Sequence, residues 1–219
     1  MNYTPQEMAT RHMYCTQPDE FLLWYYKRFA TYREVLPNSV HYWLSDKRLI
    51  TQNIDGLDGK AGNQNYIPIH GRLDKVTRFR NQNQPMQTLD APWDEVAELQ
   101  IESADNYRLK RALLETFKIS QSTRQPELDL SLKPFILLFD EYYTDLFRMN
   151  EAERWMMEAD KMVFIGTSFS VNITSFALSM GLQNGARIEI VDPEPVDLGV
   201  SSIIYNSLTA EEYISSLSQ

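Results

Sequence analysis

The chain has 219 residues, of which 43% are hydrophobic and 23% charged, with a formal net charge of -9 and a sequence pI of about 4.9. This length and mix are typical of one large globular domain, or of a domain with a small insertion. The negative charge disfavours non-specific binding to nucleic acid or to an anionic membrane, so we expect neither as a partner. The densest basic run, formed by Arg72, Lys75, Arg78 and Arg80, is followed by acidic segments and is interpreted as a solvated edge.

The single cysteine, Cys15, restricts disulfide and metal chemistry. No disulfide can form within the chain and no cysteine-based metal site is possible, so we expect no metal. No long apolar run predicts a transmembrane helix, and the first seven residues lack the basic and apolar regions of a signal peptide. The sequence therefore predicts a cytoplasmic protein.

The N-terminal third is expected to be helical. Thr4 as N-cap predicts a short helix over residues 5–13. Residues 17–19, Gln-Pro-Asp, predict a break in the chain. The dense aromatic and apolar residues of 21–32 predict a buried helix that packs on its neighbours.

A second break at Pro37 precedes a helix predicted over 39–46, with Asn38 as its N-cap. His41 lies in this helix and is interpreted as a packed or capping histidine.

Two short apolar runs predict strands over 48–52 and 66–69, and the polar residues 58–65 between them predict a loop. Polar side chains follow the first strand, and Gly56 allows the tight turn that such a loop needs. His70 ends the second run. It is the only one of the three histidines that ends a strand-like run and is followed by glycine.

Residues 71–133 have a different character, since no glycine follows Gly71 and there is no histidine or cysteine. Apolar residues at helical spacing predict one helix, from about residue 104 to 120. We interpret 71–133 as an insertion or small subdomain within a single domain, 1–219.

From Pro134 onward, strands and helices are predicted to alternate. Predicted strands cover 135–139, 162–165, 187–191 and 201–205, and predicted helices cover 151–160, 172–182 and the residues after Thr209. This rhythm predicts an α/β fold with a Rossmann-like, doubly wound parallel sheet.

Ligands collect at the carboxyl ends of strands in such sheets, so we expect the polar residues there to converge on one crevice. These residues are Asn53, Asp55, His70, Asp140, Glu141, Gly166, Thr167, Ser168 and Asp192.

The order of these motifs resembles the sirtuin (Sir2-like) family of NAD-dependent protein deacylases. Residues 51–57 reproduce the family's TQNIDGL signature, and 69–71 resemble its LHG. Residues 139–141, Phe-Asp-Glu, resemble its FGE, and 166–171 resemble its GTSLxV element. Residues 37–41 fit the family's PNxxH.

The resemblance implies that the chain uses NAD to remove acyl groups from lysine in a protein or peptide. His70 would be the catalytic base, a role suited to a near-neutral imidazole. Asn53 would take part in catalysis and, with Asp55, would contact the nicotinamide half of NAD. Gln52 would hydrogen-bond its ribose, and Ile54 of the same loop would line the cofactor site.

The resemblance also implies roles for the later motifs. Gly166, Thr167 and Ser168 would bind the adenine-side ribose, and Asp192 would accept a hydrogen bond from a ribose hydroxyl. Phe139, Asp140 and Glu141 would line the acyl-lysine channel.

The family opens with a glycine-rich strand, turn and helix whose backbone amides cradle the pyrophosphate. This sequence has no glycine before Gly56. We therefore expect the family's first strand to be missing, either because the chain is truncated at its start or because it is a divergent member. Loss of that strand would expose a sheet edge, so we also expect homo-oligomerisation or modest stability. The four zinc cysteines expected between His70 and Pro134 are absent, and 71–133 would stand in place of the zinc module.

Two alternatives stay open. One is NAD hydrolysis, with water as the acceptor. The other is a non-catalytic binder of NAD or ADP-ribose that retains the fold without the reaction.

Overall fold

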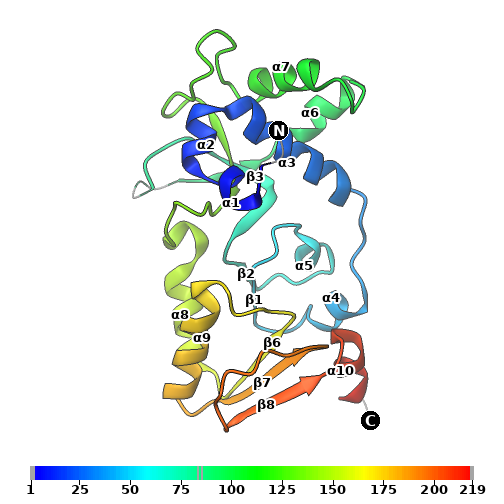
Figure 1. The fold of residues 1–219 in the computed structure, drawn as a ribbon, viewed down its shortest axis with the longest axis vertical. Helices are drawn as coiled ribbons and strands as arrows, with labels where there is room; N and C mark the ends of the chain where they lie inside the picture. The colour runs from blue at the N-terminus through cyan, green and yellow to red at the C-terminus, as the bar shows by residue number, and fades with distance from the viewer. Residues whose placement is uncertain (1–2, 83, 85, 218–219) are drawn as a thin grey trace. The chain divides into compact units, whose positions relative to one another are not determined.

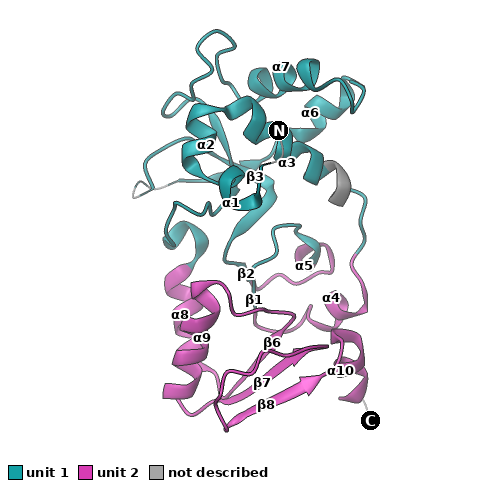
Figure 2. Cartoon of the chain, in the orientation of Figure 1, with its two compact units in different colours: residues 1–36, 50–57, 67–148 teal, residues 37–49, 58–66, 149–219 magenta. Residues whose placement is uncertain are grey.

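The computed structural model describes residues 3–82, 84 and 86–217, without the side chains of 30–32, and has a mixed α/β fold (Figure 1). The chain divides into two compact units (Figure 2). Unit 1 comprises residues 1–36, 50–57 and 67–148, and unit 2 comprises 37–49, 58–66 and 149–219.

Unit 1 combines helices with a three-stranded antiparallel sheet in the order β4-β3-β5. Its elements are α1 (Pro5–Met8), α2 (Arg11–Thr16), α3 (Pro18–Tyr32), β3 (Gly71–Arg78), β4 (Thr88–Asp90), α6 (Trp93–Glu98), α7 (Asn106–Thr116), β5 (Leu132–Ile136) and the 3-10 helix η1 (Asp145–Phe147).

An aromatic cluster fills the core of unit 1. Trp93 is fully buried, and its ring lies 4.5 Å from that of Phe117 and 5.8 Å from that of Phe29. The polar atoms of this core are satisfied by the sheet, because the Trp93 indole donates to the Leu73 carbonyl at 2.7 Å and the Tyr14 hydroxyl donates to the Leu132 carbonyl at 2.9 Å. Apolar burial therefore holds helices and sheet together.

Unit 2 is built on a parallel sheet in the order β6-β7-β8. Its elements are α4 (Ser39–Trp43), α8 (Met149–Glu158), β6 (Lys161–Ile165), α9 (Asn172–Gln183), β7 (Arg187–Asp192), β8 (Ile203–Ser207) and α10 (Ala210–Ser216). Three short elements, β1 (Leu49–Thr51), α5 (Leu57–Lys60) and β2 (Tyr66–Pro68), contain residues of both units, and β1 pairs with β2.

The central strand β7 carries the core of unit 2. Ile188 and Ile190 are buried, and so is Glu189 on the other face. The Glu189 carboxylate accepts from the Tyr213 hydroxyl at 2.8 Å and pairs with Lys161 at 2.8 Å, which satisfies the buried charge.

Helix starts follow the predicted caps. Asn38 accepts from the His41 amide at 3.2 Å and His41 returns a contact to the Asn38 amide, which confirms both the N-cap and the capping role of His41. The helix predicted after Thr209 is confirmed as α10, and Thr209 and Glu212 form a capping box at its start.

Other boundaries differ from prediction. The helix expected over 5–13 is two helices. The break expected at 17–19 is present at Gln17, between α2 and α3, but α3 begins at Pro18 and not at residue 21, since proline is well suited to the first helical position. The strand expected over 135–139 lies at Leu132–Ile136, and it pairs antiparallel with β3 instead of joining the parallel sheet. After β5 the chain turns away, since the Phe139 amide bonds to the Ala9 carbonyl.

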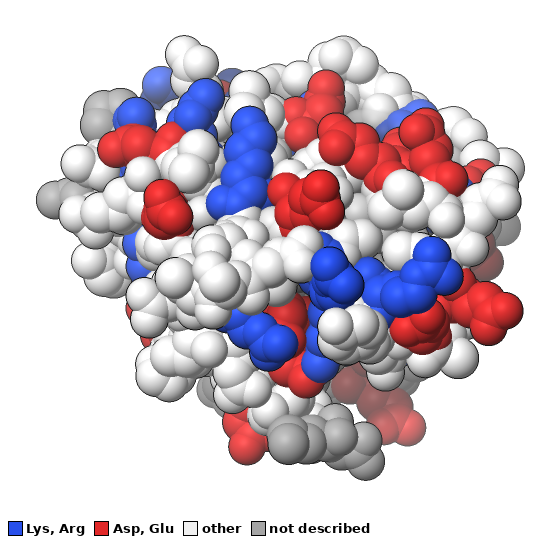
Figure 3. Space-filling model, turned by 90° about the horizontal axis from the view of Figure 1, so that it is seen from above, with Lys and Arg blue, Asp and Glu red and all other residues white. Residues whose placement is uncertain are grey.

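Two further observations concern the surface charge and the length of the helices. On the face drawn in Figure 3, basic and acidic side chains are interspersed. Within the described residues, no helix is both long and apolar enough to cross a bilayer.

Candidate functional site

The loop after β1 is held by its own side chains. The Asn53 amide donates to the Thr51 hydroxyl at 3.1 Å, and the Leu57 amide donates to the Asp55 carboxylate at 2.9 Å. Gly56 lies between these bonds with φ +77°, so the predicted tight turn is confirmed. The Asn53 side chain remains exposed to solvent.

The same loop is attached to the sheet of unit 1. The Ile54 carbonyl accepts from the Leu73 amide of β3 at 2.8 Å, and the Ile54 side chain packs against the unit 1 core. Gln52 and Asp55 are half-buried. These contacts fix the loop backbone while leaving amide and carboxylate groups at its surface.

His70 stands beside this loop. Its carbonyl accepts from the Leu137 amide at 3.0 Å, and the preceding Ile69 amide donates to the Thr51 carbonyl at 3.0 Å. The Nε2 atom of its imidazole lies 2.8 Å from the Tyr143 hydroxyl. The Ile69–Thr51 bond places His70 beside the start of the loop after β1 in unit 1.

The surroundings of His70 favour the neutral imidazole. Burial lowers the pKa of His70 from its ordinary value, and the hydrogen bond to the Gln52 backbone opposes that shift only in part. An ordinary histidine titrates near pH 6.5, so His70 is mostly unprotonated at pH 7. A neutral imidazole is the form that accepts a proton in general-base catalysis.

Gly71 makes this arrangement possible. It has φ +85°, and a Cβ atom there would lie 2.0 Å from the Phe135 carbonyl oxygen. Only glycine fits where β3 and β5 approach so closely.

The segment 139–141 has strong structural contacts. The Asp140 carboxylate accepts from the backbone amides of Arg11 at 2.6 Å and His12 at 3.0 Å, at the start of α2. Glu141 is buried and pairs with Arg11 at 3.1 Å and with Lys133 at 2.9 Å. Phe139, by contrast, is 64% exposed.

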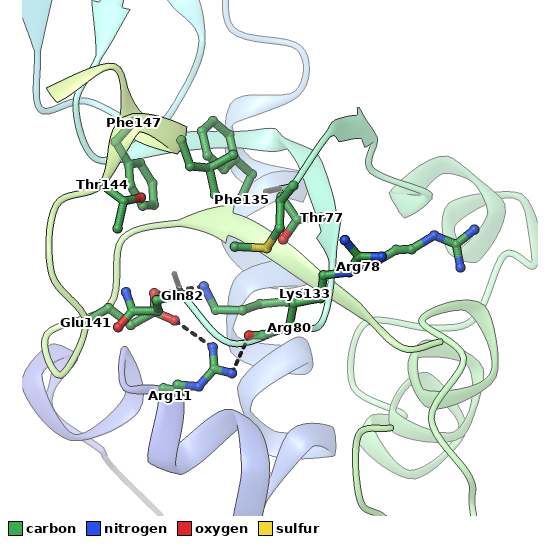
Figure 4. A pocket seen from close by; sticks show the side chains of 12 residues that line it. Arg11, Thr77, Arg78, Arg80, Gln82, Lys133, Phe135, Glu141, Thr144 and Phe147 are labelled. Carbon is green, nitrogen blue, oxygen red and sulfur yellow. Dashed lines mark hydrogen bonds and ion pairs between the residues drawn. The ribbon is translucent and has the colours of Figure 1, made fainter. Parts of the chain in front are cut away.

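A hollow in unit 1 is lined by these charged groups and by aromatic rings (Figure 4). It encloses about 340 Å³, including space open to solvent. Arg11, Lys133 and Glu141 form part of the wall, and Phe135 and Phe147 form another, with their rings stacked at 5.1 Å. Arg11 reaches both Glu141 and the Arg80 carbonyl, as Figure 4 shows. The hollow thus has an apolar and a charged side.

In unit 2, a second group of polar residues lies at the carboxyl end of β6. The Gly166 amide donates to the Val191 carbonyl of β7 at 2.9 Å. Thr167 is half-buried and Ser168 is exposed, and the Ser168 hydroxyl lies 2.7 Å from that of Ser170. A Cβ atom on Gly166 would meet nothing within 4 Å, so the space in front of this turn is open.

Asp192 ends the neighbouring strand β7. Its carboxylate accepts from the Glu194 amide at 2.9 Å and is half-buried. On the next strand, Asn206 pairs in register with Val191, and its Nδ2 atom is buried without a hydrogen-bond partner in the described residues. Unit 2 therefore gathers hydroxyl, carboxylate and amide groups at the ends of parallel strands.

Two residues of the site were missed by sequence reasoning. Tyr143 contacts the His70 ring but lies in a segment without periodicity, and only its place two residues after Glu141 could have drawn attention to it. Lys133 resembles a surface lysine in sequence, yet it is buried against Glu141 and the Ile136 carbonyl. Within the described residues, no three histidine, cysteine, aspartate or glutamate side chains gather as a metal site requires.

Two proteins with similar sequences share one description. A protein from Bacteroides thetaiotaomicron described as an NAD-dependent protein deacylase is 27% identical over 209 residues, which is 93% of this chain and 78% of the relative. A protein of the same description from Thermus thermophilus is 26% identical, with 90% and 70% covered.

Solved structures match as well. A Sir2 homologue in complex with NAD has a TM-score of 0.72 at 23% identity and covers 99% of this chain and 77% of its own. A Sir2 in complex with an inhibitor, 2'-O-acetyl-ADP-ribose and a deacetylated p53 peptide has a TM-score of 0.71 at 16% identity, with 99% and 85% covered. The model of the Sir2 family matches residues 1–173, and the chain belongs to this family.

Proposed function

We propose that this chain is an NAD-dependent protein lysine deacylase in which His70 is the general base. The observation that carries this proposal is the hydrogen bond from the Ile69 amide to the Thr51 carbonyl at 3.0 Å, because it joins the two motifs at one place in unit 1. The relatives described as NAD-dependent protein deacylases support it.

The polar groups present fit those of NAD. In unit 1, Asn53 and Asp55 would bind the nicotinamide carboxamide and Gln52 the adjoining ribose, with Ile54 beside them. In unit 2, Thr167 and Ser168 would bind the adenosine ribose. The open space at Gly166 and the unpartnered Nδ2 atom of Asn206 support a ligand at that turn. Asp192 would accept a hydrogen bond from a ribose hydroxyl there.

When bound, NAD supplies the ADP-ribose that receives the acyl group, so the products are nicotinamide, deacylated lysine and an O-acyl-ADP-ribose. His70 accepts a proton at Nε2 from a ribose hydroxyl, which its lowered pKa permits at neutral pH. Asn53 orients the reacting groups with its exposed amide.

The acyl-lysine side chain would enter along Phe139 and the segment that follows. The exposed ring of Phe139 and the presence of Glu141 and Phe147 in the wall of the 340 Å³ hollow support this path. Asp140, which caps α2, and Glu141, which is paired inside, would shape the channel by holding its backbone.

The finer architecture follows the same proposal. We infer that β6-β7-β8 belongs to a Rossmann-like sheet, and that residues 71–133 form a small subdomain in place of a zinc module, held by the Trp93 cluster. We also infer that the family's first strand has no counterpart in this sequence. In support, described residues 3–48 form helices α1 to α4 without a strand, and no glycine precedes Gly56.

The direct test incubates the full chain with NAD and an acetyl-lysine peptide and measures nicotinamide release and peptide mass. We expect both to depend on the peptide, and we expect His70→Ala to abolish them while its circular dichroism stays unchanged. Lack of peptide-dependent nicotinamide release would refute deacylation, and release without peptide would favour NAD hydrolysis.

A second candidate is a non-catalytic binder of NAD or ADP-ribose. The structural roles of Asp140, which accepts from the Arg11 and His12 amides, and of Glu141, which pairs with Lys133, favour it, because these carboxylates are then held by the fold. Calorimetry with NAD and with ADP-ribose distinguishes the cases: binding without turnover supports the binder, and turnover supports the enzyme.

A further inference from the structure

The imidazole of His70 has a phenol beside it. Nε2 lies 2.8 Å from the Tyr143 hydroxyl. Burial lowers the pKa of His70, which favours the neutral ring with one N–H and one lone pair. A phenol O–H is a stronger hydrogen-bond donor than a neutral imidazole N–H, and an imidazole nitrogen is a stronger acceptor than a phenol oxygen.

This difference sets the direction of the bond. The Tyr143 hydroxyl is the donor to the Nε2 lone pair, and the proton of neutral His70 lies on Nδ1. Burial raises the pKa of Tyr143, which keeps the phenol protonated. The two rings also stack, with centroids 5.9 Å apart and planes inclined by 30°.

The backbone on each side of Tyr143 is anchored in unit 1. On one side, the Glu141 amide donates to the Leu138 carbonyl at 2.9 Å, and its side chain is held by Lys133. On the other side, Phe147 stacks on Phe135 of β5. These anchors hold the phenol over His70 by packing and pairing that do not involve the imidazole.

We propose that Tyr143 is the positioning residue of His70: its hydroxyl donates to Nε2 and keeps the imidazole neutral, with the proton on Nδ1. The substrate hydroxyl that His70 deprotonates replaces the Tyr143 hydroxyl at Nε2. The replacement by the substrate hydroxyl rests on the proposed function, whereas the bond between Tyr143 and His70 does not.

The charged groups near His70 leave this role to Tyr143. Burial is the largest influence on the His70 pKa, and no charged side chain of the described residues shifts it. The charged groups of the adjoining segments have other partners: Asp55 bonds the Leu57 amide, Arg72 pairs with Asp74, Asp140 bonds the Arg11 amide, and Glu141 pairs with Lys133.

The first test needs no substrate. Removal of a donor to Nε2 makes protonation easier, so Tyr143→Phe should raise the pKa of His70. The expected rise is about 0.5–1 pH unit, the size of one ordinary hydrogen bond. The measurement is an NMR titration of the histidine Cε1–H signals in the full ligand-free chain, with His70 identified by its loss in His70→Gln.

Tyr142→Phe is the matched control, because Tyr142 is a neighbouring tyrosine that is 66% exposed. It should leave the His70 titration unchanged. In Tyr143→Phe the aromatic ring and its stacking on His70 are preserved, and unchanged circular dichroism checks that the fold is retained. An unchanged or lowered His70 pKa in Tyr143→Phe would overturn the assignment.

The second test uses turnover. The pH profile of kcat/KM reports groups of the free enzyme, and that of kcat reports the complex. Because substrate displaces Tyr143 from Nε2, Tyr143→Phe should move the acid limb of kcat/KM upward by the NMR shift and leave the acid limb of kcat in place. Equal movement of both limbs would refute the displacement. If no turnover is found, the proposed function fails while the titration still decides the role of Tyr143.

Discussion

Gly71 follows His70 at a position where the neighbouring backbone leaves no room for a side chain. Its φ of +85° is unfavourable for any other residue, and the Phe135 carbonyl oxygen occupies the space of a Cβ atom. The sequence shows that a glycine follows a strand-like run, but it does not show why glycine is required there. The close approach of β5 comes from a residue 64 positions later in the chain, which no local pattern reports.

We predict that Gly71→Ala destabilises the fold by about 2–5 kcal/mol. Left-handed strain contributes about 1–2 kcal/mol and forced overpacking about 1–3 kcal/mol. Urea unfolding followed by fluorescence measures the change. Gly185→Ala is the control, because Gly185 has φ +72° and open space around its Cβ position, so only the strain applies. Equal losses in the two variants would show that the contact with β5 does not matter.

At the scale of elements, local signals predicted several helix starts and one tight turn, but α5 lies largely within the predicted loop 58–65 and α6 was not predicted. The caps at Asn38 and Thr209 and the turn at Gly56 depend on neighbouring residues, and each is present. Strand β3 was missed because a register shift between Arg72 and Val76 interrupts the alternation of buried and exposed positions. Its charged residues were therefore interpreted as a solvated edge. The partner of a strand is a long-range choice, and this is why β5 was placed in the wrong sheet.

The buried ion pair between Lys133 of β5 and Glu141 allows a second prediction. Burial lowers the pKa of Lys133, and the Glu141 carboxylate opposes that shift. Lys133→Met should cost about 3 kcal/mol or more, because Glu141 loses a buried partner. The double variant Lys133→Met/Glu141→Gln should be more stable than Lys133→Met, since glutamine is neutral and still accepts from the Leu138 amide. Chemical unfolding of the four proteins of this cycle gives the coupling energy. A cost below about 1 kcal/mol for Lys133→Met would place the pair among weak surface ion pairs.

For the whole molecule, the sequence predicted an exposed sheet edge. Strand β6 pairs with β7 alone in the described sheet, and its side chains are exposed or half-buried where those of β7 are mostly buried. We therefore predict that the chain self-associates, although its charge of -9 opposes association at low salt. Light scattering at about 20 and 300 mM salt, where screening differs strongly, should show a mass that rises with salt. A well-folded monomer in both conditions would contradict this expectation.

The bond between the His70 carbonyl and the Leu137 amide has a consequence for motion. It lies one residue beyond the last registered pair of β3 and β5, Gly71 with Ile136, at the end of their ladder. The Leu137 proton should therefore exchange with deuterium more slowly than the amides of exposed loops. The exposed Asn53 side chain lies outside this ladder and can reorient on far shorter timescales. The catalytic base of the proposed enzyme is thus attached to the end of a sheet, and adaptation to different acyl groups is left to exposed side chains beside it.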